Sequence, residues 1–507
     1  MPVRRLLFAN IVIEFLLTLT FLGLKRRVSV VFLGLLFLPL FSQTPDSARR
    51  LLFDFQLDHA NELIRSSSVS VEKLKLESLS DFLTLLSDQS ELSYKVFEKQ
   101  SKRLAKDLKK TFDNKSFRSS SFLFKHYLFS AIASSQYSDY PSAAKSVFRA
   151  FKYYIRMVEK HPAHTESKLA GAIMTVLSEQ VPDQYAKMIP KGMSNPNQTP
   201  GFTQLKNVYQ KALLSRSELS LEAGLLWVIL LWEFSPDDNE TWAAWMEVSK
   251  NESLSGLLSA KYVGIMAAFK SGQRDYLSST FNSMPEEDMD RLKYLYFQRG
   301  KHLLFEFDPT GLEDLNTFIN LSPRGNFVKT AWLRLGWYHL ISHNDQKANM
   351  CFSKVLSDGI DKIWIDEQSI SEAENADSYN SDLLKLRMLY DGGNYLECLH
   401  AIEAHELSGS LQSSSFVAEM QYRKARCLQG LKRDSESLKA YDVLLQNHLD
   451  EESYIIPQAA IIASSIAEKR GDIDAALSYL DIAESCNNHE FQKTFWRQIQ
   501  STRRRLN

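Results

Sequence analysis

The stretch TAWLRLGWYHL, Thr330 to Leu340, contains the pattern that decides the fold. It places Trp332 and Trp337 around a Leu-Gly pair in a segment with helical periodicity. Glycine inside a helix costs about 1 kcal/mol relative to alanine, so Gly336 must allow a contact that a larger side chain would block. We interpret Gly336 as a packing residue that lets a second helix approach closely.

The residues that follow complete a tetratricopeptide-type signature, with W-x-x-L-G in a first helix and Ala and Phe in a second. The matching residues are Trp332, Leu335, Gly336, Ala348, Phe352 and Val355. Small residues at such positions let the two helices approach, and large ones fill the space between neighbouring hairpins. This stretch is therefore predicted to form one helical hairpin of a repeat stack.

Weaker copies of the pattern recur downstream. A Gly392-Gly393 turn precedes Cys398 and Ile402, and a Gly471-Asp472 turn lies in the last copy. The other matching residues are Ala425, Ser437, Tyr441 and Leu444 in the third hairpin and Ser464, Ala476, Leu480 and Ala483 in the fourth. Four consecutive hairpins, from about Phe327 to Asn488, exceed the three repeats that a stable stack needs.

The composition agrees with a helical chain. The 507 residues are 44% hydrophobic and 24% charged, with only 19 Gly and 14 Pro. This length predicts several domains or an extended repeat array. The formal net charge of -1 gives no general attraction to nucleic acid, so no nucleic-acid partner is expected. We predict an all-α fold, an α-solenoid of tetratricopeptide-like helical hairpins.

We expect five segments along the chain. They are residues 1–42, a signal peptide or membrane segment; 43–188, an N-terminal helical region; 189–202, a loop; 203–325, degenerate helical repeats; and 326–507, tetratricopeptide repeats. The loop is predicted from the Pro, Gly and Asn density of IPKGMSNPNQTPGF. Upstream of it, DYPSAAKSVFRAFKYYIRMVEKHP opens at a turn, reads as one long amphipathic helix and ends at His161-Pro162. Downstream, LSLEAGLLWVILLWEF is apolar nearly all round and is predicted to be a buried helix.

The N-terminal segment has the order of a secretory signal peptide. Three basic residues, 25–27, precede the apolar run Val28 to Phe41, and small polar residues follow it. We expect cleavage near Ser42 or Gln43, although Leu40 stands where a small residue is usual. From this pattern we predict that the chain is exported and periplasmic.

A second apolar run, Leu6 to Gly23, leaves two alternatives open. Translation could start near residue 24, or the two runs could anchor the chain in a membrane. In either case membrane contact is expected only through this N-terminal segment.

Several local patterns resemble exported tetratricopeptide-repeat proteins of Bacteroidota-type bacteria, a group of uncharacterised function. The patterns are LSEQVPDQYAKMIPKGM, FINLSPRGNFVKTAWLRLGWYHLISHND and AALSYLDIAESCNNHEFQ. The resemblance covers most of Thr165 to Asn507 and extends, more distantly, to tetratricopeptide proteins of the mitochondrial outer membrane. It implies a scaffold or binding role and brings no catalytic residues.

No set of catalytic or metal-binding residues is found in the sequence. It contains no GxxxxGK[ST], GxGxxG or GxSxG motif. His339 and His343 are predicted to lie at i, i+4 on one helix face, a spacing that can bind zinc, but the glutamate of the metalloprotease motif is missing between them. The four cysteines, Cys351, Cys398, Cys427 and Cys486, form no CxxC pair and are predicted to be core residues, with a disulfide left open if the chain is exported. We predict no enzyme activity, cofactor or metal.

A basic run, Lys95 to Arg118, carries nine basic residues against three acidic ones. The simplest interpretation is an outward helix face. Contact with an acidic partner or with lipid headgroups is the alternative.

The concave groove of a repeat stack is its expected binding surface. Counting from the packing residues, the groove-facing positions include Trp337, Arg387, Tyr422 and Arg426. Arginines flanked by aromatic rings suit a peptide with acidic and apolar groups. The alternative is that these four pack within the stack itself.

We therefore predict a non-enzymatic scaffold that binds a partner protein or peptide in this groove, in the bacterial cell envelope. The second hypothesis is an envelope protein that binds a ligand such as a glycan on similar helical repeats.

Overall fold

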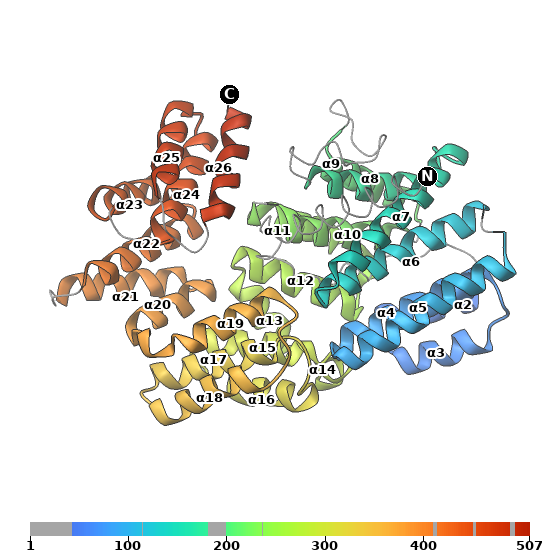
Figure 1. Cartoon of the computed structure of the whole chain (residues 1–507), viewed down its shortest axis with the longest axis horizontal. Coiled ribbons are helices and arrows are strands. Elements are labelled where there is room, and N and C mark those ends of the chain that lie inside the picture. Colours follow the sequence, from blue (N-terminus) through green and yellow to red (C-terminus); the bar gives the residue numbers. More distant parts are fainter. Residues whose placement is uncertain are drawn as a thin grey trace, which may run out of the picture.

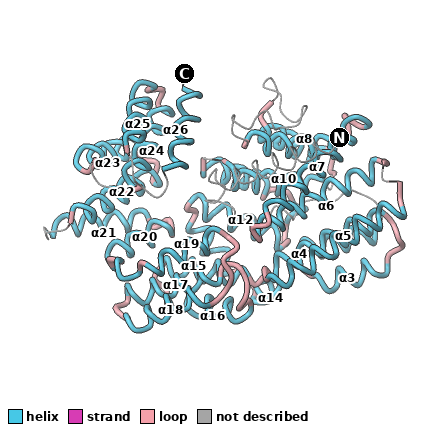
Figure 2. Tube along the Cα trace, viewed as in Figure 1, coloured by secondary structure: helices cyan, strands magenta, loops and turns pink. Residues whose placement is uncertain are grey.

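The computed structural model describes residues 43–113, 115–180, 199–217, 219–235, 237–408, 413–449, 453–486 and 492–506. Within these ranges the chain is helical, and neighbouring helices pack as consecutive hairpins (Figures 1 and 2). The predicted all-α stack of tetratricopeptide-like hairpins is confirmed. The predicted signal segment, 1–42, and most of the predicted loop, 189–202, lie outside the described residues.

The N-terminal helices are α2 (Gln43–Phe53), α3 (Leu57–Ser66), α4 (Val71–Asp88), α5 (Glu91–Thr111), α6 (Phe117–Gln136), α7 (Tyr140–Lys160) and α8 (Thr165–Glu179). The middle helices are α9 (Gly201–Leu214), α10 (Leu219–Phe234), α11 (Asp238–Val248), α12 (Leu258–Ser271), α13 (Arg274–Asn282), α14 (Glu286–Arg291), α15 (Tyr294–Phe305) and α16 (Gly311–Leu321), with a 3-10 turn at Glu252–Leu254. The long helix predicted before His161-Pro162 is α7, and the predicted buried helix is α10.

The C-terminal helices are α17 (Val328–Ile341), α18 (Asp345–Ser357), α19 (Trp364–Glu374), α20 (Ser381–Asp391), α21 (Tyr395–Ser408), α22 (Ser414–Gly430), α23 (Asp434–Asn447), α24 (Ile455–Lys469), α25 (Ile473–Ser485) and α26 (Gln492–Leu506), with a 3-10 turn at Ala376–Ser378. The four predicted hairpins are α17–α18, α20–α21, α22–α23 and α24–α25. Helix α19, which the repeat pattern did not predict, is inserted after the first of them.

Gly336 has the packing role that the sequence predicts. A Cβ atom on Gly336 would lie 2.5 Å from the ring of Phe352 on α18. The first helices of two upstream hairpins carry glycines in the same way, Gly264 on α12 and Gly300 on α15. Gly264 faces the rings of Trp245 and Tyr276, and Gly300 faces the backbone at the start of α16. The three glycines are evenly spaced along the chain, so the same repeat extends upstream of residue 326.

Buried serines take the place of small packing residues in the last two hairpins: Ser437 stands at the position of Ala348, and Ser464 at that of Gly336. Ser437 on α23 donates a hydrogen bond to the carbonyl of Ala425 on α22, at 2.9 Å. Ser464 on α24 donates to the carbonyl of Ala476 on α25, at 2.8 Å. Both serines are buried, and each bond fixes the register of its hairpin.

The apolar core runs through the predicted segment boundaries. One cluster of contacting buried residues extends from Ala48 on α2 to Met388 on α20. Two smaller clusters lie in the C-terminal hairpins, around Cys398 and around Tyr441. Helix α9 begins at Gly201, so the last two residues of the predicted loop are helical, and α9 packs on α8. No helix within the described ranges is long and apolar enough to cross a membrane.

The chain curves so that its C-terminal helices face its middle helices (Figure 1). Lys469, at the end of α24, forms an ion pair with Asp237, just before α11, at 3.6 Å. Arg274 on α13 pairs with Glu397 on α21 at 3.3 Å. We call the surface between the middle and the C-terminal helices the inner surface.

Candidate functional site

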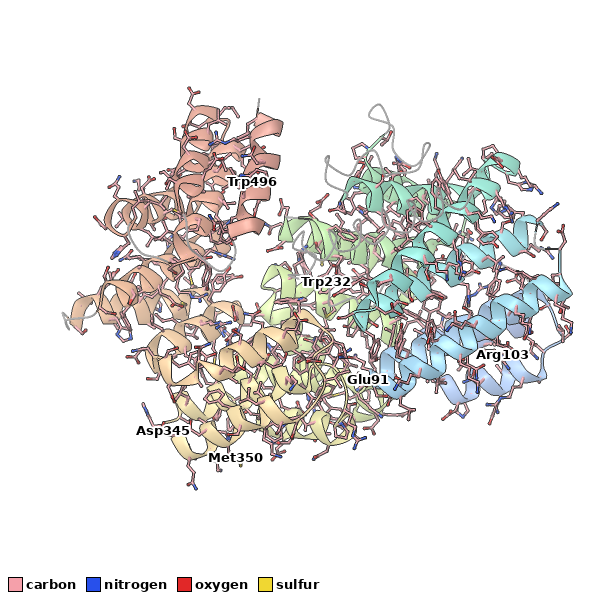
Figure 3. The ribbon with its side chains drawn as sticks, in the orientation of Figure 1. Glu91, Arg103, Trp232, Asp345, Met350 and Trp496 are labelled. Atoms are coloured by element: carbon pink, nitrogen blue, oxygen red, sulfur yellow. The ribbon has the colours of Figure 1, made fainter. Side chains whose placement is uncertain are left out.

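A cavity of about 380 Å³ opens on this inner surface. Its walls come from α10, α11, α12, α15, α17, α19 and α20, and Trp232, at the end of α10, lies near the middle of the molecule in Figure 3. The cavity is largely aromatic, and its rings are those of Trp232, Phe269, Tyr294, Phe297, Phe305, Phe327 and Trp364. A concave, mostly apolar cavity with a few polar groups is the usual form of a ligand site.

Three basic side chains also line the cavity, and their environments differ. Lys270 donates to the carbonyls of Leu231, Trp232 and Ser235 at 2.8 to 2.9 Å, so it caps the end of α10. Lys301 instead lies over the ring of Phe269, with its Nζ 3.6 Å from the ring centroid. Burial, and then repulsion by Arg334, lower the pKa of Lys301 to about 7.

Arg334 is the third basic residue, and its hydrogen bonding is incomplete. Its guanidinium carbon lies 3.9 Å from the ring centroid of Trp337 and 5.4 Å from that of Phe305. Its Nε and Nη1 are buried and have no hydrogen-bond partner among the residues described. Burial lowers the pKa of Arg334 to about 10, opposed by the nearby Asp391 carboxylate. Buried donors of a charged group are normally paired, so this one is ready to bind an anion.

Arg387 covers the other face of Trp337, with its guanidinium carbon 4.4 Å from the ring centroid. It donates two hydrogen bonds to Glu372 on α19, at 2.9 and 3.0 Å. Glu372 also accepts from the hydroxyl of Tyr379 at 2.7 Å, and Trp337 Nε1 donates to the same hydroxyl at 3.2 Å. Glu372 therefore satisfies Arg387 and holds its side chain in place.

A similar arrangement continues on α22. Arg426 donates to the hydroxyl of Tyr422 at 2.9 Å and also to that of Tyr390, and lies over the ring of Tyr390. Arg423 pairs with Glu419 at 3.0 Å. The Nε atoms of both arginines are buried without a partner in the described part of the chain. We call the four residues Arg334, Arg387, Arg423 and Arg426 the arginine ladder.

The structure buries two of the four residues of the predicted site. Trp337 is 0% exposed and Tyr422 is 4% exposed, so neither ring offers surface to a partner. Arg334 of the same helix and Arg387 of α20 lie over the Trp337 ring, and Arg423 and Arg426 of the same helix lie over the Tyr422 ring. Arg387 and Arg426 are half-buried, and their role in binding stays a prediction.

Sequence reasoning missed Arg334 and Lys301, two of the three basic residues that line the cavity. A signal for both was present. Lys301 follows Gly300 as Trp337 follows Gly336, so it occupies the same helical position one repeat earlier. Arg334 lies one helical turn before Trp337, inside the stretch that defines the repeat.

The structure also corrects the placement of His343. Helix α17 ends at Ile341, and His343 lies in the following turn with φ of 56°, so it does not share a helix face with His339. In the described ranges no group of three or more His, Cys, Asp or Glu side chains could hold a metal ion.

The four cysteines are free thiols, three of them buried and Cys486 half-buried. A hydrogen bond with Cys398, together with burial, raises the pKa of the Cys427 thiol, so these two side chains are neighbours.

Comparison with known proteins gives structural likeness only. No family model matches the chain, and no curated protein matches it. The crystal structure of yeast Tom70 is similar at 12% identity and a TM-score of 0.23, over 91% of this chain and 96% of that one. The P58(IPK) TPR domain is similar at 12% identity and a TM-score of 0.21, over 80% of this chain and 97% of that one. With values this low, the fold description rests on the hairpins of the chain itself.

Proposed function

We propose that this protein is a non-enzymatic scaffold that binds an extended segment of a partner protein along its inner surface. An acidic side chain or a terminal carboxylate of that segment enters the cavity and accepts hydrogen bonds from Arg334. Apolar side chains of the same segment pack on the aromatic walls. The mechanism is complementarity of shape and charge, without turnover.

The observation that carries the proposal is the buried, unbonded pair of donors on Arg334. A buried guanidinium with empty donors costs free energy unless an anion pairs with it. Lys301 lies in the same cavity and adds a second positive charge when it is protonated. A carboxylate would satisfy both groups, and the aromatic walls would remove it from water.

The test is a selection from a random peptide library against the full-length protein. We expect the selected peptides to contain Asp or Glu next to large apolar residues, and the binding to weaken when that acid is changed to its amide. Arg334→Met should reduce affinity about ten-fold, which corresponds to about 1.4 kcal/mol. Arg324→Met is the matched control, because Arg324 is an exposed arginine outside the cavity. Selected peptides without acids, or equal affinity in both variants, would contradict the proposal.

A glycan ligand is the second candidate, and the two tryptophans of the cavity favour it. Trp232 and Trp364 present rings on which a sugar can stack, and Trp364 Nε1 is buried without a partner among the described residues. A glycan array probed with the same protein distinguishes the candidates. Binding to glycans, together with failure of the peptide selection, would favour this second function.

Export to the bacterial cell envelope belongs to the same proposal and rests on the pattern of residues 1–42. N-terminal sequencing of the mature protein, with cell fractionation, tests it. A periplasmic protein that begins near Gln43 is expected. An intact N terminus in the membrane fraction would instead support the anchored alternative.

A further inference from the structure

A second cavity lies far from the first along the chain, in the N-terminal helical region. It has a volume of about 390 Å³ and is lined by side chains of α5, α6 and α7. Helices α5 and α7 both pack on α6, so the cavity is a trough whose floor is α6. We call it the basic trough. It contains part of the basic run for which the sequence left two interpretations open.

Two rows of cations form the sides of the basic trough. Helix α5 contributes Lys102, Lys106 and Lys109, and α7 contributes Lys145 and Arg149. The spacings of three and four residues within each row place its members on one face of their helix. The cavity lining contains one acidic residue, Glu98, and it pairs with Lys102. The basic run is therefore not spread evenly round α5, because three of its lysines line one cavity.

The charges of the trough are incompletely balanced. Neither Lys106 nor Lys145 has an ion-pair or hydrogen-bond partner among the residues that the structure describes. Arg149 lies over the ring of Tyr127, 5.3 Å from its centroid, and Lys109 reaches the hydroxyl of the same tyrosine at 3.5 Å. Positive charges that line one cavity repel each other, and a bound polyanion would offset that repulsion by attracting all of them.

Hydroxyl groups from α4, α5 and α6 surround a neutral histidine, His126, on the floor of the trough. Ser101 bonds with His126 Nε2 at 3.0 Å and with Ser130 at 2.9 Å, while His126 Nδ1 bonds with Ser78 at 2.8 Å. Burial lowers the pKa of His126 to about 4, so this ring is uncharged at neutral pH. The floor therefore supplies uncharged hydrogen-bonding groups, and the positive charge comes from the two rows above it.

We propose that the basic trough binds a small molecule that carries several phosphate groups, of the class of phosphorylated polyols. Each phosphate has three strong acceptor oxygens and up to two negative charges, which suits lysines above serine hydroxyls. The volume is within the range of small-molecule sites, whereas a flat membrane surface would not need a recess. The same chemistry occurs free in solution and in the headgroup of a phosphoinositide lipid. This site is independent of the inner-surface cavity.

The first experiment uses titration calorimetry of the full-length protein with inositol hexakisphosphate. We expect binding at one site, weakened by added salt. The double variant Lys106→Gln/Lys145→Gln should lower the affinity about ten-fold or more. The control is Lys110→Gln/Lys152→Gln, which removes the same charge from exposed lysines of the same two helices that do not line the trough. Equal losses in both double variants, or no binding by the unaltered protein, would overturn the proposal.

The second experiment distinguishes the two sources of phosphate. Vesicles with and without phosphatidylinositol 4,5-bisphosphate are mixed with the protein and floated on a density gradient. If the ligand is a headgroup, the protein floats only with the phosphoinositide vesicles, and inositol hexakisphosphate releases it. If the ligand is soluble, calorimetry shows trough-dependent binding and the protein does not float. Flotation that the trough variant and the control variant share would contradict a specific site. All variants should keep the melting temperature of the unaltered protein, because the four changed lysines are exposed.

Discussion

At the scale of single residues, Gly336 shows how one missing side chain positions two helices. Its absent Cβ is the space into which the ring of Phe352 packs. The penalty of a helical glycine is thereby offset by contact between α17 and α18. The same ring also packs against Tyr379, at 6.0 Å between centroids, so its position is fixed by contacts besides that with Gly336.

Gly336→Ala therefore should destabilise the protein although alanine favours a helix. Overpacking of a core costs about 1–3 kcal/mol, and the gain in helix propensity is about 1 kcal/mol, so we expect a net loss of up to about 2 kcal/mol. Urea denaturation measures it. Adding Phe352→Leu should reduce the extra loss, because the clashing ring is gone. If the losses of stability from the two changes are strictly additive, the clash with the Phe352 ring is not the cause of the loss in Gly336→Ala.

Lys301 makes a prediction about pH. Its pKa is about 7 in the folded protein and about 10.4 in an unfolded chain. Between these values the unfolded chain binds a proton that the folded one lacks, so the contribution of Lys301 to stability rises with pH across this range. Lys301→Met removes the charge. Its melting temperature should exceed that of the unaltered protein most at pH 6, with a smaller difference at pH 10.

The control for that experiment is Lys301→Arg. An arginine stays charged up to pH 10. The loss of stability from burying its charge should therefore persist at pH 10, where the lysine is neutral and no longer has that cost. Calorimetry at pH 6, 8 and 10 provides the comparison. If Lys301→Met and the unaltered protein differ by the same amount at every pH, Lys301 does not titrate in this range.

At the scale of helices, α19 supports the helix that carries Arg334. Asp366 on α19 is fully buried and accepts hydrogen bonds at the start of α17, from Phe327 N at 2.6 Å and from Thr330 N and Oγ1 at 3.0 and 2.9 Å. The first N–H groups of a helix have no partner within it, and a carboxylate there also interacts favourably with the helix dipole.

Asp366→Ala should therefore destabilise the protein by about 3 kcal/mol, because two buried N–H groups lose their acceptor. Asp366→Asn keeps an acceptor oxygen and should lose less. Chemical denaturation of both variants is the measurement. Equal losses would mean that the packing of α19, and not its hydrogen bonds to α17, matters at this position.

The helices also show what a single sequence could and could not reveal. The turns at Gly393 and Gly471 were predictable, since both residues have positive φ values of 80° and 79°, which glycine adopts without strain. The burial of Trp337 was not predictable, because Arg387 covers its ring from another helical hairpin. Helix α19 was missed because it lies between two repeats and has no place in their pattern.

The candidate site was predictable only in outline. The repeat pattern predicts an inner surface with arginine and aromatic residues, and the placing of Arg387 and Arg426 on it stays a prediction. Which cation would be left without a partner depends on contacts between helices far apart in sequence. Glu372 satisfies Arg387, whereas Arg334 finds no equivalent acceptor among the described residues.

At the scale of the whole molecule, a buried ion cluster joins the N-terminal region to the repeats. Lys125 on α6 lies 3.6 Å from Glu166 on α8 and 3.0 Å from Glu222 on α10. The cluster therefore connects helices on both sides of the predicted loop, within the continuous core. The two predicted regions should unfold together rather than as independent domains.

Lys125→Met tests this coupling. It leaves two buried carboxylates without their cation, and we expect a loss of about 3–5 kcal/mol. Hydrogen exchange should quicken on both sides of the predicted loop, in α6 and in α10. Adding Glu222→Gln removes one of the two unpaired negative charges and should recover part of the lost stability. Faster exchange confined to α6 would show that the two regions are separate units.

The central claim is that Arg334 binds a carboxylate of the partner, and one measurement tests it most directly. It is a double-mutant cycle between Arg334→Met and the acid-to-amide change in a peptide selected from the library, with each affinity measured by calorimetry. We predict a coupling free energy of about 1.5 kcal/mol or more, as found for close charge pairs at interfaces. Independent effects of the two changes would show that the carboxylate binds elsewhere, and the proposed site would be wrong.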